Sequence, residues 1–215
     1  MSVWAIVVAA GGGERFGSAK QFLTLGDSTV VGRAVATASA ACDRVVVVLP
    51  ADSPWAPPEG VLTAAGSSTR AGSVRAGLST VGDEATVIVV HDAARPLATV
   101  DLFQSVIAAV RAGADGAVPG VPIADTVKRV AAATVVETLD RSALVGVQTP
   151  QAFRADVLRA AHATAADATD DAALVEAIGG RVVVVPGDPA NFKVTQPDDL
   201  ARAEACLAAE PARGV

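Results

Sequence analysis

Residues 3–21 read VWAIVVAAGGGERFGSAKQ, an unbroken apolar run followed by three glycines and then by basic residues. A run of apolar residues without alternation is typical of a parallel strand that is buried on both faces of a sheet. Three consecutive glycines allow the backbone to turn sharply and to bring its N–H groups close to a ligand. The stretch therefore predicts a strand over residues 3–9 that leads into an anion-binding loop.

Two side chains of this loop, Arg15 and Lys20, add positive charge to its backbone donors. The spacing differs from that of a P-loop, because no Gly-Lys-Ser/Thr follows the glycines. It also lacks the helix with a third packing glycine that completes a dinucleotide-binding turn. We interpret Arg15 and Lys20 as groups that neutralise phosphate charge in a transition state. The alternative is a tight turn that carries two solvated cations.

Length and composition limit the classes of function. A chain of 215 residues can form one domain with a substantial core, and no stretch is long and apolar enough to span a bilayer. The net charge of −6 argues against a broad surface for nucleic acid or membrane, so an anion site must be a local basic cluster. Cys42 and Cys206 lack metal-like spacing, and a reducing, cytoplasmic setting suits them.

Strand-like runs alternate with helix-like segments along most of the chain. This alternation predicts an α/β, Rossmann-like fold with a mainly parallel sheet and helices on both faces. The expected strands cover residues 3–9, 44–49, 61–65, 86–91, 116–119 and 181–185. The expected helices cover residues 30–41, 70–78, 100–112, 155–165, 171–178 and 197–207. Ligands of such sheets bind beyond the carboxyl ends of the strands, where the glycine loop and residues 91–96 are expected.

Residues 121–147 break this rhythm. Apolar and polar residues alternate over 126–130 and over 135–138, with a short connection between them, and this pattern predicts a β-hairpin. The hairpin is either a decoration at the sheet edge or an arm that grips another subunit.

Asp92 and Lys193 are further candidates for phosphate chemistry. Asp92 follows the fourth expected strand, where one carboxylate suits a Mg²⁺ ion that is bound mainly to phosphate oxygens, although it could equally cap the turn. Lys193 lies in a short apolar segment, so it either reaches a phosphate or is a lysine whose stem packs there while its amine reaches water. We interpret His91 as structural and assign no role to His162.

Small polar residues begin two of the expected helices. Residues 66–70 read GSSTR and residues 169–172 read TDDA, and both patterns are typical of helix N-caps. For residues 66–70 the alternative is recognition of a nucleobase edge. We find no arrangement typical of a covalent nucleophile. Nucleotidyl transfer needs only positioning and charge neutralisation, for which the cations named above are sufficient.

The motifs, taken in order, resemble one enzyme family. They are Ala9-Ala10-Gly11 with Arg15 and Lys20-Gln21, Arg70 with Ser73-Val74, His91-Asp92-Ala93-Ala94-Arg95-Pro96, Asp125-Thr126, Asp140-Arg141, Gln148-Thr149-Pro150-Gln151, Thr169-Asp170-Asp171-Ala172 and Phe192-Lys193-Val194-Thr195. In this order and spacing the chain is similar, over nearly its whole length, to the 2-C-methyl-D-erythritol 4-phosphate cytidylyltransferases of the non-mevalonate isoprenoid pathway.

The resemblance implies a nucleotidyltransferase domain over residues 1–215 and a homodimer joined by the arm at 121–147. It implies transfer of CMP from CTP to methylerythritol phosphate, with Mg²⁺ or Mn²⁺ near Asp92. The implied catalytic residues are Arg15, Lys20 and Lys193. The implied CTP-binding residues are Ala9, Ala10, Gly11, Gly12, Gly13, Ser68, Ser73 and Asp92. The implied polyol-phosphate site, completed by the partner chain, contains Arg95, Thr126, Arg141 and Thr149.

Two other functions remain open at this stage. Cytidylyltransferases that act on ribitol 5-phosphate share the fold and the motifs. A regulatory module that binds nucleotide without turnover would share the glycine loop, but it has less need of three cations aimed at an α-phosphorus.

Overall fold

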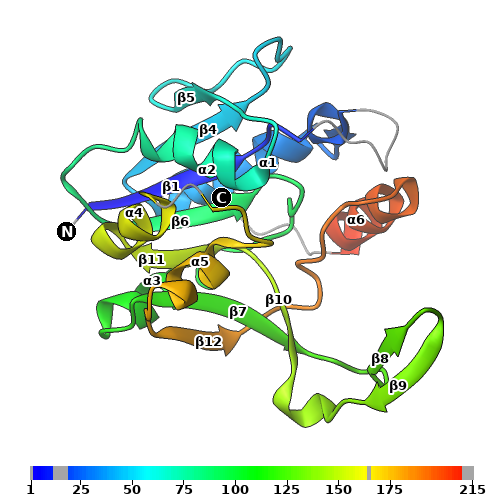
Figure 1. Cartoon of the computed structure of the whole chain (residues 1–215). Helices are drawn as coiled ribbons and strands as arrows, with labels where there is room; N and C mark the ends of the chain where they lie inside the picture. Colours follow the sequence, from blue (N-terminus) through cyan, green and yellow to red (C-terminus); the bar gives the residue numbers. More distant parts are fainter. Residues whose placement is uncertain (1, 12–18, 164–165, 210–215) are drawn as a thin grey trace.

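The computed structural model describes residues 2–11, 19–163 and 166–209, and Figure 1 shows their arrangement. The strands of the central sheet are β1 (Ser2–Val8), β4 (Arg44–Leu49), β5 (Leu62–Ala65), β6 (Ala85–Asp92), β7 (Gly116–Pro122), β10 (Val145–Val147), β11 (Gln151–Arg154) and β12 (Val182–Pro186). Their order in this eight-stranded sheet is β10-β7-β11-β6-β1-β4-β5, with β12 paired to β7. β10 and β11 are antiparallel to their neighbours, and the remaining pairs are parallel.

Helices cover both faces of the sheet. They are α1 (Val30–Ala41), α2 (Arg70–Leu78), α3 (Val100–Arg111), α4 (Ala155–Ala163), α5 (Asp171–Ala177) and α6 (Pro197–Ala209). Successive side chains of a strand point to opposite faces. Ala5 and Val7 of β1 therefore pack in one cluster with α1 and α3, while Trp4 and Ile6 pack in another with α2, α4 and α5. In Figure 1, α2, α4 and α5 lie in front of the sheet.

The predicted α/β fold is confirmed. The helices over 30–41 and 70–78 and the strand over 44–49 have the predicted ends, and the other predicted elements differ by one to three residues where the structure describes them. The predicted helix over 155–165 ends at Ala163, and its last two residues lie outside the described ones. β10 and β11 were not predicted, because each has at most four residues and neither shows a periodic pattern.

A small unit beside the sheet packs against α6. It contains the 3₁₀ turn η1 (Lys20–Phe22) and the hairpin of β2 (Thr24–Leu25) and β3 (Ser28–Thr29). A third apolar cluster joins this unit to α6 through buried Leu25, Val30, Val194 and Ala203. The segment between β12 and α6 is thereby fixed against the body.

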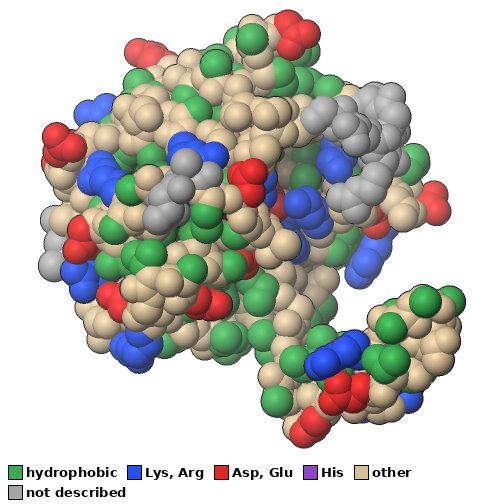
Figure 2. Space-filling view, viewed as in Figure 1, with side chains coloured by type: hydrophobic (Ala, Val, Ile, Leu, Met, Phe, Trp, Pro, Cys, Tyr) green, Lys and Arg blue, Asp and Glu red, His purple; other side chains and the backbone are tan. Residues whose placement is uncertain are grey.

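The predicted hairpin is confirmed, with corrected limits. β8 (Lys128–Ala131) and β9 (Thr134–Thr138) pair antiparallel, and their connection has positive φ angles at Ala132 (43°) and Ala133 (66°). The arm is shorter than the predicted 121–147, because pairing with β10 keeps residues 120–122 in β7 on the central sheet. It includes the 3₁₀ turn η2 (Arg141–Ala143), and it projects away from the body in Figures 1 and 2.

Within the part of the chain that is described, no helix combines the length and the apolar character needed to cross a bilayer.

Candidate active site

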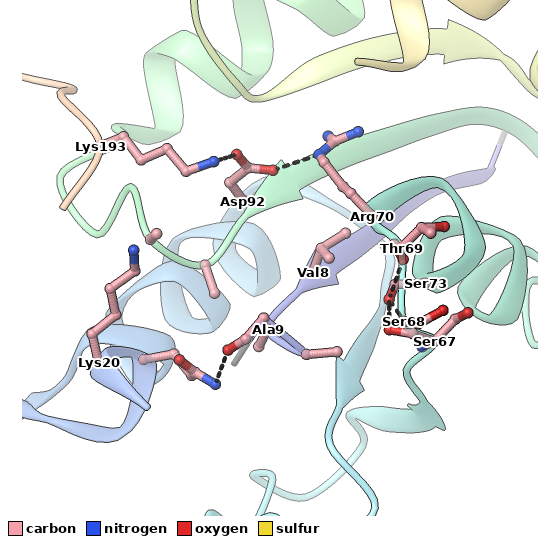
Figure 3. Close-up of a pocket in the computed structure, with 15 residues that line it drawn as sticks. Val8, Ala9, Lys20, Ser67, Ser68, Thr69, Arg70, Ser73, Asp92 and Lys193 are labelled. Carbon is pink, nitrogen blue, oxygen red and sulfur yellow. Dashed lines mark hydrogen bonds and ion pairs between the residues drawn. The ribbon is translucent and has the colours of Figure 1, made fainter. Parts of the chain in front are cut away.

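A cleft of about 550 Å³ opens at the carboxyl ends of β1, β5 and β6 (Figure 3). Ligands bind at this edge of open α/β sheets. We call it the large cleft, and it is lined by Val8, Ala9, Ala10, Gly11, Lys20, Gln21, Ser67, Ser68, Thr69, Arg70, Ser73, Asp92, Ala93, Ala94 and Lys193. Side chains of Lys and Arg gather in the hollow seen in Figure 2.

The loop that follows β1 lines the large cleft through Ala9, Ala10 and Gly11, as predicted. The buried Gln21 side chain donates a hydrogen bond from Nε2 to the Gly11 carbonyl at 3.0 Å and so fixes the start of this loop. A Cβ at Gly66 would lie 2.1 Å from the Cβ of Ala10. Glycine at position 66 therefore lets the loops after β1 and β5 approach each other. Gly12, Gly13 and Arg15 lie outside the described residues, and their roles stay predictions.

Hydroxyl side chains at and near the start of α2 line one side of the cleft, as Figure 3 shows. Thr69 is the N-cap of α2, since its Oγ1 accepts a hydrogen bond from the Gly72 amide at 3.0 Å. Ser73 is buried, and its Oγ accepts from the Ser67 amide at 3.1 Å. Ser68 and Ser73, for which the resemblance implies a role in CTP binding, both line the cleft. The N-cap interpretation is thus confirmed for this segment, and recognition of a nucleobase by its hydroxyls stays a prediction.

Asp92 lies at the end of β6 between two cations. Arg70 donates from Nε to Oδ1 at 3.1 Å, and Lys193 donates from Nζ to Oδ2 at 2.6 Å (Figure 3). Burial alone would raise the pKa of the Asp92 carboxyl, but the two cations outweigh it and hold that pKa well below its usual range. Asp92 is therefore a carboxylate at neutral pH.

Arg70 also pairs with a buried carboxylate, that of Asp171. Its Nη1 donates to Oδ2 of Asp171 at 2.7 Å, and Oδ1 of Asp171 lies 3.0 Å from Nε2 of His162. The Asp171 and His162 side chains are 1% and 2% exposed, so water does not screen this pair. Burial would lower the pKa of Arg70, but Asp171 and Asp92 raise it further than burial lowers it. The guanidinium is therefore a fixed positive charge.

A second cleft of about 220 Å³, which we call the small cleft, adjoins the first. Its lining residues are Arg70, Asp92, Arg95, Val147, Gln148, Thr149, Gln151, Thr169, Asp170 and Lys193. Arg70, Asp92 and Lys193 line both clefts and form the wall between them. The two clefts can place two phosphate-bearing molecules against one charged wall.

Two of the predicted polyol-phosphate residues line the small cleft. Arg95 donates from Nη1 to the Asn191 carbonyl at 2.7 Å, and burial lowers its pKa from the usual value. Thr149 is buried, and its Oγ1 accepts a hydrogen bond from the Asp92 amide at 3.0 Å. Thr149 thus also fixes the backbone of Asp92.

The other two, Thr126 and Arg141, lie on the arm and are exposed. Neither is among the described residues that line the two clefts. Arg141 donates a hydrogen bond to the Ala124 carbonyl within the arm. One chain therefore does not bring them together with Arg95 and Thr149.

His91 is structural, as predicted. Its ring is fully buried, with Nδ1 3.1 Å from Thr149 Oγ1 and Nε2 3.2 Å from the Arg95 carbonyl. A carbonyl only accepts, so Nε2 carries the proton and Nδ1 accepts from the threonine hydroxyl. Burial lowers the pKa of His91 to about 4. The neutral ring thus fixes the Thr149 side chain and the Arg95 backbone, and Thr149 in turn holds the Asp92 amide.

We expect acidification to destabilise the fold through His91. Below its usual pKa of 6.5 the unfolded chain binds a proton that the folded chain refuses until about pH 4. In this window the free energy of unfolding should fall by up to about 1.4 kcal/mol per pH unit. The Asp92 carboxylate also lowers the free energy of unfolding on acidification, but only below its usual pKa of 3.8. Urea unfolding at intervals from pH 7 to pH 4 measures the slope, and His91→Gln should flatten it. An equal slope in the variant would show that another group is responsible.

The family model for 2-C-methyl-D-erythritol 4-phosphate cytidylyltransferase, IspD, matches residues 3–209. The chain belongs to the IspD family.

Curated and solved members of the IspD family resemble the chain over nearly its whole length. The 2-C-methyl-D-erythritol 4-phosphate cytidylyltransferase of Nocardia farcinica is 46% identical, with 96% of this chain and 94% of the relative covered. The bifunctional IspD/IspF enzyme of Clavibacter michiganensis is 45% identical over 97% of this chain, which spans only 55% of that longer protein. The crystal structure of the Thermus thermophilus enzyme superposes with a TM-score of 0.83 at 33% identity, covering 97% of this chain and all of the other.

Several residues of the site were not assigned a role from the sequence. Arg70 appears only within a motif, Asp171 only within the N-cap pattern of residues 169–172, and His162 has no predicted role, yet the structure joins the three side chains. The predicted N-cap at the start of α5 is confirmed, since Oδ1 of Asp170 accepts a hydrogen bond from the Ala173 amide at 3.0 Å. A second aspartate after an adequate cap, together with an arginine at the start of another helix, was the available signal.

Proposed function

We propose that the protein transfers the cytidylyl group of CTP to 2-C-methyl-D-erythritol 4-phosphate and releases pyrophosphate. The observation that carries the proposal is the wall of Arg70, Asp92 and Lys193 between a large and a small cleft. A transfer reaction needs two substrates held on either side of one charged centre, whereas simple nucleotide binding needs one cleft. The names of the family and of its close relatives supply the substrates.

In this proposal CTP occupies the large cleft and methylerythritol phosphate the small one. The hydroxyl side of the large cleft, with Ser68 and Ser73, receives the base, and the loop after β1 receives the phosphates. Arg95 supplies guanidinium donors to the phosphate of the acceptor, while Thr149, whose hydroxyl donates to His91, lines the same cleft and holds the Asp92 backbone. That phosphate then approaches the α-phosphorus from the side of Lys193.

The reaction is an in-line displacement. An oxygen of the acceptor phosphate forms a bond to the α-phosphorus, while the bond from that phosphorus to the oxygen bridging to the β-phosphate breaks. Pyrophosphate takes the bonding electrons, and the product is 4-diphosphocytidyl-2-C-methyl-D-erythritol. Lys20, Lys193 and Arg15 neutralise the negative charge that gathers at the phosphorus and on the leaving group. No covalent enzyme intermediate is required.

Asp92 is the residue that we propose to hold Mg²⁺ or Mn²⁺. It is a single carboxylate on the cleft wall, which suits an ion that takes most of its ligands from phosphate oxygens and water. Each Asp92 oxygen accepts one hydrogen bond from a cation, and a carboxylate oxygen has a second acceptor position. When bound, the ion would neutralise and orient the phosphates.

Asp92→Asn should raise the Mg²⁺ concentration needed for half-maximal activity by about tenfold or more. The amide is a weaker ligand than the carboxylate for a hard cation. Titration of activity with Mg²⁺ at fixed CTP measures the shift. Asp101→Asn, an exposed change on α3, is the matched control. The same requirement in Asp92→Asn and wild type would remove Asp92 from the metal site.

We further propose a cytoplasmic homodimer joined by the arm. Every residue of β8 and β9 is exposed, and Val130, Val135 and Val136 are each more than half exposed. A two-stranded ribbon is marginal in water, and a symmetric partner is the commonest cover for such apolar side chains. Thr126 and Arg141 would then complete the small cleft of the other subunit. Cys42 and Cys206 are free thiols, which suits a reducing compartment.

Pyrophosphate release tests the proposal and its alternatives together. We expect rapid release with CTP and methylerythritol phosphate, and much slower release with ribitol 5-phosphate or with UTP or ATP in place of CTP. A site that pairs with one base edge strongly rejects another. Turnover with ribitol 5-phosphate alone would show that the protein is a cytidylyltransferase for ribitol 5-phosphate instead. CTP binding without turnover on either polyol would establish a regulatory module.

A further inference from the structure

The segment that carries Lys193 has no helix or strand of its own. It joins β12 to α6, and residues 187–196 are turns or irregular backbone. A lysine on such a segment would sample many positions unless neighbouring groups fixed its backbone. Two buried amide side chains, Gln148 and Asn191, do so.

The Gln148 side chain uses both of its polar atoms on this segment. Its Nε2 donates to the carbonyls of Asp188 at 2.7 Å and Asn191 at 3.2 Å. Its Oε1 accepts from the Asp188 amide at 3.2 Å and from Asn191 Nδ2 at 3.3 Å. The backbone of Gln148 is itself fixed, since its amide donates to the Pro119 carbonyl of β7 at 2.9 Å. One side chain thus attaches the segment to the central sheet.

Lys193 lies between two buried anchors. On one side, Asn191 is fully buried and donates from Nδ2 to the Thr149 carbonyl at 2.9 Å. On the other, Val194 is fully buried in the cluster with α6, and its amide donates to the Ala94 carbonyl at 2.8 Å. Lys193 is more exposed than either anchor, and its ammonium contacts Asp92.

The same anchor contacts the predicted acceptor-binding arginine. The Asn191 carbonyl accepts hydrogen bonds from Gln148 Nε2 and from Arg95 Nη1 at 2.7 Å. A shift of Asn191 would therefore move a group of the small cleft together with Lys193. The position of both depends on one carbonyl.

We propose that Gln148 and Asn191 are positioning residues for Lys193, which keep its ammonium on the wall between the clefts. The inference rests on the proposed function of that wall. An amide is required at position 148, because it supplies two donors and accepts at one oxygen, whereas a carboxylate supplies no donor.

Gln148→Glu preserves size and removes both donors, so two carbonyls would face a carboxylate oxygen. We expect kcat to fall by about 10²-fold, the effect of a misplacement of about 1 Å. The KM for CTP should change little, because Gln148 does not line the large cleft. Amide hydrogen exchange at Asn191 and Val194 should become faster. Gln104→Glu, the same chemical change at an exposed position of α3, should alter none of these quantities.

A double-mutant cycle separates positioning from general damage. If Gln148 acts through Lys193, Gln148→Glu should lower kcat by less than about threefold in a Lys193→Ala background, because effects through one group are not additive. An undiminished effect in that background would overturn the proposal, and so would wild-type kcat or unchanged hydrogen exchange in Gln148→Glu alone.

If Gln148→Glu fails to fold, Asn191→Asp removes the donor to Thr149 and Gln148 and is subject to the same cycle. Failure of the proposed function would be seen separately, as wild-type protein that releases no pyrophosphate.

Discussion

Lys20→Ala should lower kcat by about 10²–10³-fold while it changes the Kd for CTP only a few-fold. A cation that meets charge developing on the leaving group interacts more strongly with the transition state than with bound CTP. Such a loss appears in kcat rather than in binding. Lys20 is placed for this role, because it begins η1 and lines the large cleft opposite the hydroxyl side (Figure 3). Arg15→Ala should behave in the same way.

Steady-state kinetics and calorimetric CTP binding on the same preparations measure the two quantities. Arg44→Ala is a suitable control, since Arg44 is exposed at the amino end of β4, away from the clefts. A Lys20→Ala enzyme with wild-type kcat, or one whose loss is entirely in CTP affinity, would remove Lys20 from the chemistry.

Much of the fold could be predicted because parallel strands leave a simple trace in the sequence. β1, β4 and β6 are almost wholly buried, and each therefore contains an uninterrupted run of at least four apolar residues. β11 is different, since its four residues QAFR include polar ends, yet it lies between β6 and β7. Its place depends on pairing with distant strands, which no local pattern records.

The residues of the site also differ in whether a local sequence pattern predicts their place. Asp92 ends β6 and Lys20 belongs to the connection that leaves β1, and a general rule for parallel sheets places such strand ends together. The pairing of Arg70 with Asp171, 101 residues apart, depends on how α2 and α5 pack on one face. Each residue had an adequate local explanation at a helix start, so the only signal was one aspartate more than the cap required, and that signal does not name the partner. Charged side chains whose partners come from distant elements can therefore be identified only from the folded structure.

Arg141→Ala and Lys20→Ala should each be nearly inactive alone, and a mixture of the two should regain activity once subunits exchange. If the arm completes the partner's small cleft, each site takes Lys20 from one chain and Arg141 from the other. A mixed dimer then has one site with both residues intact. With equal amounts and random exchange, about a quarter of all sites would be intact.

A second mixture is the matched control for this experiment. Lys20 and Lys193 line the same cleft of one chain, so Lys20→Ala mixed with Lys193→Ala leaves no intact site in any dimer and should regain nothing. Sedimentation of each variant checks that it is a dimer before mixing. A fully active monomer would contradict the shared site, as would an Arg141→Ala mixture that recovers no more than the control. In either case the exposed valines of β8 and β9 would need another partner, because their own chain does not cover them.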